Sequence, residues 1–171
     1  LSQVRWVQGD ATDYNTVSKI VQDADAVVHS IGLLFDVDSG LQGLNKIVSG
    51  SGSLPGDQST YDNITRLTMF NVIQAISAKK SNPFAKKERM PLCFVSCAEA
   101  GWPDVTMGDF VEEKLAPEWL QKYLKAKRAV ESKLGESKTQ IRACIYRPSL
   151  IWDWTKFDVL PVIPVFNLAS A

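Results

Sequence analysis

Short apolar runs rich in β-branched residues alternate along the chain with segments of helical periodicity. Each run predicts a β-strand, and the runs are VRWVQGD (4–10), AVVHSIGLLF (26–35), PLCFVSCA (91–98) and IRACIYRPSLIW (141–152). The unbroken apolar character of the second run predicts burial on both faces. Strands that alternate with helices pair in parallel through helical crossovers. We therefore predict an α/β fold with a doubly wound parallel sheet.

Three segments between these runs predict helices, at 15–25, 60–80 and 117–134. Pro117 lies in the first turn of the third segment, and Gly135 follows its last apolar residue, which is the usual punctuation of a helix. Residues 41–59 predict a loop, because glycine and serine gather there. In an open α/β sheet the ligand lies outside the carboxyl ends of the strands, so we expect the functional residues there.

Composition limits the classes of partner. The chain has 171 residues, which we interpret as a single domain (1–171) that is large enough to bury a core. Its 19 Lys and Arg balance 19 Asp and Glu, so charge gives no reason to expect a nucleic acid partner. No apolar run reaches the roughly 20 residues of a transmembrane segment, and three cysteines suit a reducing compartment. The lone histidine, His29, favours a hydrogen-bonded structural role, and we predict no metal site.

The helix at 117–134 carries a lysine within its apolar stripe. Residues 120, 123, 127, 130 and 134 fall at steps of three and four, and Lys127 is the only charged one among them. One explanation is that the stem of Lys127 lies on apolar surface while its ammonium reaches water. The other is that the ammonium lies one turn from Tyr123 and lowers the phenol pKa from about 10. A phenol tuned in this way exchanges a proton with a carbonyl or alcohol oxygen.

Tyr123 and Lys127 form a Tyr-x-x-x-Lys pattern that resembles the signature of the short-chain dehydrogenase/reductase family. Four further segments resemble strands of that family and occur in its order: VQGDATD, DADAVVHSIG, FVSCAEAG and IYRPSLIW. Together they span nearly the whole chain. The details are most similar to the atypical, extended members found in mitochondria, including those of coenzyme Q biosynthesis and the accessory Rossmann subunit of respiratory complex I.

The resemblance implies a Rossmann-like fold, a role for each matching residue, and NAD or NADP as cofactor. The implied catalytic residues are Tyr123 as acid/base, Lys127 as the group that holds the ribose and tunes the phenol, and Ser96 as a ligand of the substrate oxygen. Besides Tyr123 and Lys127, the implied cofactor contacts are Asp10 and Ala11 at the adenine, Ser30, Ile31 and Gly32 at the ribose, and Pro148, Ser149 and Leu150 at the nicotinamide.

The chain departs from the family pattern at three points. The Gly-rich phosphate-binding turn is not recognisable, so we expect this sequence to be a fragment that lacks the first β-α-β unit and continues past its apolar end. Cys97 stands where active members usually carry a second small hydroxyl residue. Thr65 stands where an asparagine often completes the active set.

Two functions from different classes remain open on the sequence. The first is an NAD(P)-dependent oxidoreductase of quinone metabolism that acts on a carbonyl or alcohol. The second is a non-catalytic nucleotide-binding accessory or assembly subunit of a respiratory or other organellar membrane complex. Both interpretations predict a mitochondrial protein on the matrix side, with the plastid as the alternative. Substrate, NAD versus NADP and oligomeric state stay open.

Overall fold

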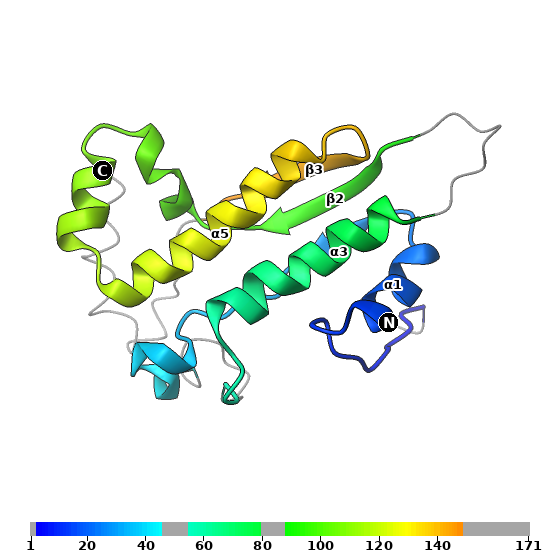
Figure 1. Ribbon diagram of the computed structural model, residues 1–171, viewed down its shortest axis with the longest axis horizontal. Coiled ribbons are helices and arrows are strands. Elements are labelled where there is room, and N and C mark those ends of the chain that lie inside the picture. Colours follow the sequence, from blue (N-terminus) through cyan, green and yellow to red (C-terminus); the bar gives the residue numbers. More distant parts are fainter. Residues whose placement is uncertain (1–2, 46–54, 80–87, 149–171) are drawn as a thin grey trace.

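The structure is a computed structural model that describes residues 3–45, 55–79 and 88–148. Three parallel strands form one sheet in the order β1-β2-β3, with β1 at Val27–His29, β2 at Met90–Val95 and β3 at Ile141–Tyr146. Each connection between neighbouring strands contains a long helix (Figure 1). The predicted α/β class with a parallel, Rossmann-like sheet is therefore confirmed.

Helices account for most of the remaining regular structure. The principal helices are α1 (Tyr14–Gln22), the π-helix η3 (Asp62–Leu67), its continuation α3 (Thr68–Ser77) and α5 (Glu118–Glu136). The shorter helical segments are η1 (Val37–Ser39), η2 (Gln42–Leu44), η4 (Ala98–Asp104), α4 (Gly108–Phe110) and η5 (Val111–Leu115). Asp13 caps α1 by accepting hydrogen bonds from the backbone N–H groups of Asn15 and Thr16.

The main core lies between the sheet and the helices. Leu92 and Phe94 point from β2 toward this layer and are buried with Val130 and Leu134 of α5. The apolar faces of α1 and α3 complete the same cluster. A second cluster joins Cys97 and Trp102 to Leu120 and Leu124, so α5 packs against both the sheet and the segment that follows β2. Figure 1 shows α3 and α5 running side by side in front of the strands.

Three details of the predicted elements are wrong. Residues 4–10 form no strand, and the side chains of Val4 and Trp6 are exposed, Trp6 by 86%. The second strand covers only Val27–His29, and Val28 is 71% exposed, so it is not buried on both faces. The third predicted helix runs to Glu136, and Gly135 lies inside its last turn.

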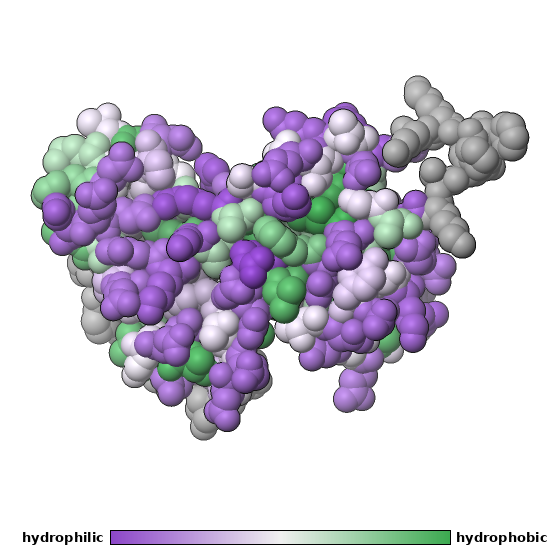
Figure 2. All heavy atoms as spheres, in the orientation of Figure 1, coloured by the Kyte–Doolittle hydropathy of each residue, from purple (hydrophilic) through white to green (hydrophobic). Residues whose placement is uncertain are grey.

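The first two differences concern strand pairing. A strand needs a neighbour for its backbone hydrogen bonds, and residues 4–10 pair with none of the strands of the described sheet. Figure 2 shows the helical face of the molecule, where hydrophilic residues predominate and apolar residues form small patches. Within the described residues, no helix combines the length and apolar character that a bilayer span requires.

Candidate functional site

The loops that follow the three strands meet at the carboxyl end of the sheet. The backbone N–H of Ser96, just after β2, donates to the carbonyl of Tyr146 at the end of β3, at 2.8 Å. Two residues on, the N–H of Ala98 donates to the carbonyl of Pro148 at 2.9 Å. This is the edge at which open α/β sheets bind their ligands.

Lys127 reaches this edge from α5. Its side chain is buried, with 3% of the residue exposed, and Nζ donates a 2.8 Å hydrogen bond to the carbonyl oxygen of Val95, the last residue of β2. The ammonium also lies 5.1 Å from the ring centroid of Phe94. Burial lowers the pKa of Lys127. The explanation in which the ammonium extends into water is therefore wrong, because the charge lies inside the protein.

Tyr123 lies one turn before Lys127, and the ammonium lies 5.4 Å from the centroid of its ring. The pKa of Tyr123 is raised, first by burial and then by the neighbouring Cys97. The expectation that the ammonium lowers the phenol pKa is thus wrong for this arrangement. Burial outweighs the charge, and the phenol stays protonated at neutral pH.

Ser96 is 4% exposed and its hydroxyl is already engaged. Ser96 Oγ donates a 2.6 Å hydrogen bond to Glu131 Oε1 on α5. Arg147, just after β3, holds the same carboxylate through contacts of 3.1 Å from Nε and 2.5 Å from Nη2. The side chain that meets the phenol of Tyr123 is Cys97, not Ser96.

Ser30, Ile31 and Gly32 follow β1 and are exposed. Gly32 faces the buried ammonium, because a Cβ atom added there would lie 3.7 Å from Lys127 Nζ. A larger side chain would therefore occupy the space next to the ammonium. The structure thus brings together the predicted ribose loop and the predicted ribose-binding lysine.

Asp10 and Ala11 lie at a different point, beside α3. Asp10 Oδ1 accepts hydrogen bonds from the N–H and the hydroxyl of Thr12, at 2.8 and 2.7 Å, which fixes a local turn. Asn71 Nδ2 donates to the carbonyls of Ala11 and Thr12, at 3.1 and 2.9 Å. Asn71 therefore holds the predicted adenine loop against α3.

Of the predicted nicotinamide contacts, only Pro148 belongs to the described residues. It is half-buried next to the segment that follows β2, as its bond to Ala98 shows. Ser149 and Leu150 lie outside the described residues.

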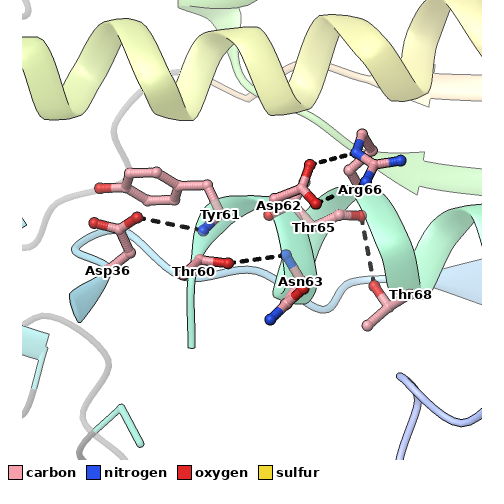
Figure 3. A network of polar contacts seen from close by, with 8 residues as sticks. All are labelled: Asp36, Thr60, Tyr61, Asp62, Asn63, Thr65, Arg66 and Thr68. Atoms are coloured by element: carbon pink, nitrogen blue, oxygen red, sulfur yellow. Dashed lines mark hydrogen bonds and ion pairs between the residues drawn. The ribbon is translucent and has the colours of Figure 1, made fainter. Parts of the chain in front are cut away.

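His29 and the π-helix η3 lie next to the buried Lys127. His29 Nε2 lies 2.9 Å from Thr68 Oγ1, as expected for a structural histidine. Burial, followed by the charge of Lys127, lowers the pKa of His29 to about 4. Figure 3 shows Thr65 and Thr68 on consecutive turns beside α5, and Thr65 Oγ1 is buried without a hydrogen-bond partner.

Tyr61, at the start of η3, packs against Tyr123. Its hydroxyl donates to the carbonyl of Leu34 at 2.7 Å, and its ring lies edge-on to that of Tyr123 with centroids 5.5 Å apart. Burial raises the pKa of Tyr61 to about 12. Tyr61 also lines a cavity of about 340 Å³ between α5 and η3, bordered by Asp36 and Ala126. The backbone N–H of Tyr61 donates to the Asp36 carboxylate (Figure 3).

Glu131 and Arg128 are site residues that the sequence prediction missed. Arg128 donates to the carbonyl of Ala100 at 2.9 Å and forms a two-point ion pair with Glu112, which fastens the segment after β2 to α5. The available signal for Glu131 was its position four residues after Lys127, on the same side of the helix.

The described residues contain no group of three or more His, Cys, Asp or Glu that could hold a metal ion. Comparison of the chain with models of known protein families finds no match, and comparison with curated proteins finds none either.

Proposed function

We propose that this chain binds NAD or NADP at the carboxyl edge of the sheet and belongs functionally with the atypical short-chain dehydrogenases/reductases. The observation that carries the proposal is the buried ammonium of Lys127, which lies between the end of β2 and the loop at Gly32. A buried charge costs free energy unless partners compensate it. A ligand with several hydroxyl oxygens supplies such partners.

The chemistry of Lys127 matches a ribose. An ammonium has three N–H donors, and the described residues show one hydrogen bond from it, to Val95. Ribose hydroxyls would accept the remaining donors, and Gly32 presents no side chain to the ammonium, since an added Cβ would lie 3.7 Å from Nζ. When bound, a nicotinamide dinucleotide supplies or accepts a hydride. Asp10, Ala11 and Pro148 would contact its other parts in the family arrangement.

Tyr123 is the hydroxyl that we propose as hydrogen-bond donor to the substrate oxygen. Its raised pKa keeps the phenol neutral at physiological pH, so it can donate a hydrogen bond to a carbonyl oxygen as negative charge develops there, while the same raised pKa opposes complete transfer of the proton. As substrate we propose a carbonyl or alcohol of mitochondrial quinone metabolism. The support for this class is the sequence resemblance.

A second candidate is a non-catalytic nucleotide-binding accessory or assembly subunit of an organellar membrane complex. The bond from Ser96 to Glu131 favours it, because the hydroxyl that would orient a substrate is occupied. The contact of Tyr123 with Cys97 points the same way. In this alternative Lys127 holds the dinucleotide as a structural ligand, and Tyr123 performs no chemistry.

A measurement of dinucleotide binding tests the proposed cofactor site. We expect NADH or NADPH to bind the purified full-length protein and Lys127→Ala to weaken binding at least tenfold in calorimetry. Lys125→Ala is the matched control, because Lys125 lies on the same helix and is exposed. Equal binding by wild type and Lys127→Ala would contradict the proposal.

Tyr123→Phe then separates the two candidates. The enzyme interpretation predicts unchanged dinucleotide binding and a loss of turnover of at least 100-fold with a quinone-type carbonyl substrate. The accessory-subunit interpretation predicts that Tyr123→Phe supports assembly of the complex as well as wild type does, whereas Lys127→Ala does not. Fractionation of cells that produce the tagged full-length protein tests the proposed mitochondrial location, with plastids as the alternative.

A further inference from the structure

Cys93 and Cys144 face each other across two neighbouring strands. They are direct partners in the register of β2 and β3. Directly paired residues of adjacent strands place their side chains on the same face of the sheet, and the strands lie about 4.8 Å apart. The two thiols are therefore neighbours on one face of the sheet.

This pair lies on the face of the sheet opposite the helices. Leu92 and Phe94, on either side of Cys93 in the sequence, point into the core beneath α5. Cys93 therefore points the other way, in line with Val28 of β1, which is 71% exposed. Cys144 is exposed and Cys93 half-buried, so solutes reach the pair.

The third cysteine has a different environment. Cys97 lies beyond the end of β2 and is buried with Leu120 and Leu124 of α5. It serves as an internal comparison, because it has the same chemistry and no thiol neighbour in the described sheet.

We propose that Cys93 and Cys144 form a two-thiolate binding site for a soft monovalent cation, of which Cu(I) is the biological example. Metal–thiolate bonds are about 2.3 Å long in zinc sites, so two bonds of that order in line span about 4.6 Å. The side chains of a direct pair stand roughly perpendicular to the sheet, so on strands about 4.8 Å apart rotation about the Cα–Cβ bonds brings the two sulfurs to that separation. Binding replaces the two thiol protons with one cation and involves no change of oxidation state.

The number of ligands favours Cu(I) over zinc. Structural zinc takes four ligands, and the described residues hold no group of three or more His, Cys, Asp or Glu that could bind a metal. Soft thiolate ligands select Cu(I), which accepts two of them in a linear arrangement. A free thiol is mostly protonated at neutral pH, so the cation displaces protons when it binds.

The test is an anaerobic titration of the full chain with Cu(I) in competition with the chelator bicinchoninate. We expect one Cu(I) retained per wild-type chain, and none retained by Cys93→Ser or by Cys144→Ser. Cys97→Ser is the matched control and should retain one. Circular dichroism checks the fold of each variant, and Cys144, exposed on β3, provides the variant least able to disturb the core.

Several results would overturn the proposal. They are the absence of Cu(I) retention by wild type, full retention by Cys144→Ser, and loss of retention in Cys97→Ser. Retention of Zn(II) as tight as that of Cu(I) would also overturn it, since zinc would then have found more ligands than two thiolates.

Discussion

The hydroxyl of Ser96 donates a 2.6 Å hydrogen bond to the carboxylate of Glu131, and Arg147 holds the other oxygen of that carboxylate at 2.5 Å. This chain of three side chains links the end of β2, the middle of α5 and the end of β3. It directs Ser96 to Glu131 and leaves Cys97 as the neighbour of the Tyr123 phenol. The proposed site therefore differs at this position from the one that the sequence resemblance implies.

Glu131→Gln should destabilise the protein in a pH-dependent way. Burial disfavours the charged carboxylate, but hydrogen bonds from Arg147 and Ser96 prevail and lower its pKa below the ordinary 4.5. The stabilisation is therefore present above pH 4.5 and is lost as the pH falls through the lower folded value. We expect urea unfolding to show a loss of about 1–2 kcal/mol at pH 7 and a much smaller difference near pH 3.

Glu136→Gln is the control for that measurement. Glu136 also pairs with a lysine on α5, but its side chain is 62% exposed, and exposed pairs contribute little. An equal loss at pH 7 and pH 3 for Glu131→Gln would contradict the role of its charge.

Lys127→Met should stabilise the fold while weakening dinucleotide binding. Burial lowers the pKa of Lys127, so below its folded pKa the protein carries the full cost of a buried charge. Replacement of a buried charge by an apolar side chain of similar length often stabilises, and we expect a gain of about 1 kcal/mol at pH 7. The gain should shrink as pH rises toward 10.5, because the wild-type amine then loses its proton.

The measurement is urea unfolding at several pH values, with Lys125→Met as the exposed control that should change little. A loss of stability in Lys127→Met at pH 7 would show that the bond to Val95 outweighs the cost of burying the ammonium.

His29 should make stability fall on mild acidification. Its folded pKa of about 4 lies below the ordinary 6.5, so its contribution is complete above pH 6.5 and is lost as the pH falls toward 4. The slope from this residue is at most about 1.4 kcal/mol per pH unit. His29→Gln keeps a donor for Thr68 and removes the titration, so the difference between wild type and variant should narrow from pH 7 to pH 4. A constant difference across that range would contradict the assignment.

Replacement by valine at two threonines three residues apart should change the stability of the protein in opposite directions. Thr65 is fully buried and its hydroxyl has no partner, so Thr65→Val removes an uncompensated polar group and should stabilise by about 1 kcal/mol. The hydroxyl of Thr68 donates to the carbonyl of Ile64 at 2.7 Å and meets His29. Thr68→Val should therefore cost about 1–2 kcal/mol. Thermal and urea unfolding of both variants checks the sign of each change.

The order and type of the elements were readable from local pattern. The stripe on α5 placed Leu120, Val130 and Leu134 in the core and Lys127 among them, as the structure has it. Residues 4–10 were misread, because β-branched and aromatic residues such as Val4 and Trp6 form a strand only beside another strand. That partner is a non-local feature which no short window contains.

The sequence predicted the parts of the candidate site that depend on position along a strand or helix. It did not predict the parts that depend on long-range pairing of side chains. Lys127 and Gly32 were predicted to lie close together, and they do. The partnership of Ser96 with Glu131 bridges 35 residues, and a glutamate on a helix is most often solvated. The phenol pKa was predicted in the wrong direction, since the depth of burial of Tyr123 is a property of the packed structure.

The π-helix at Asp62–Leu67 has a consequence for how this chain tolerates change in length. Each turn there accommodates an additional residue relative to an α-helix. Deleting one residue from it would yield an ordinary α-helical path into α3 with nearly the same rotation, because one extra residue is what distinguishes the π-helical turn. Tyr61 would then keep its contacts with Tyr123 and Leu34. A single-codon deletion at this place should therefore be tolerated, whereas a deletion within α3 would rotate one side of that helix against the other by about 100°.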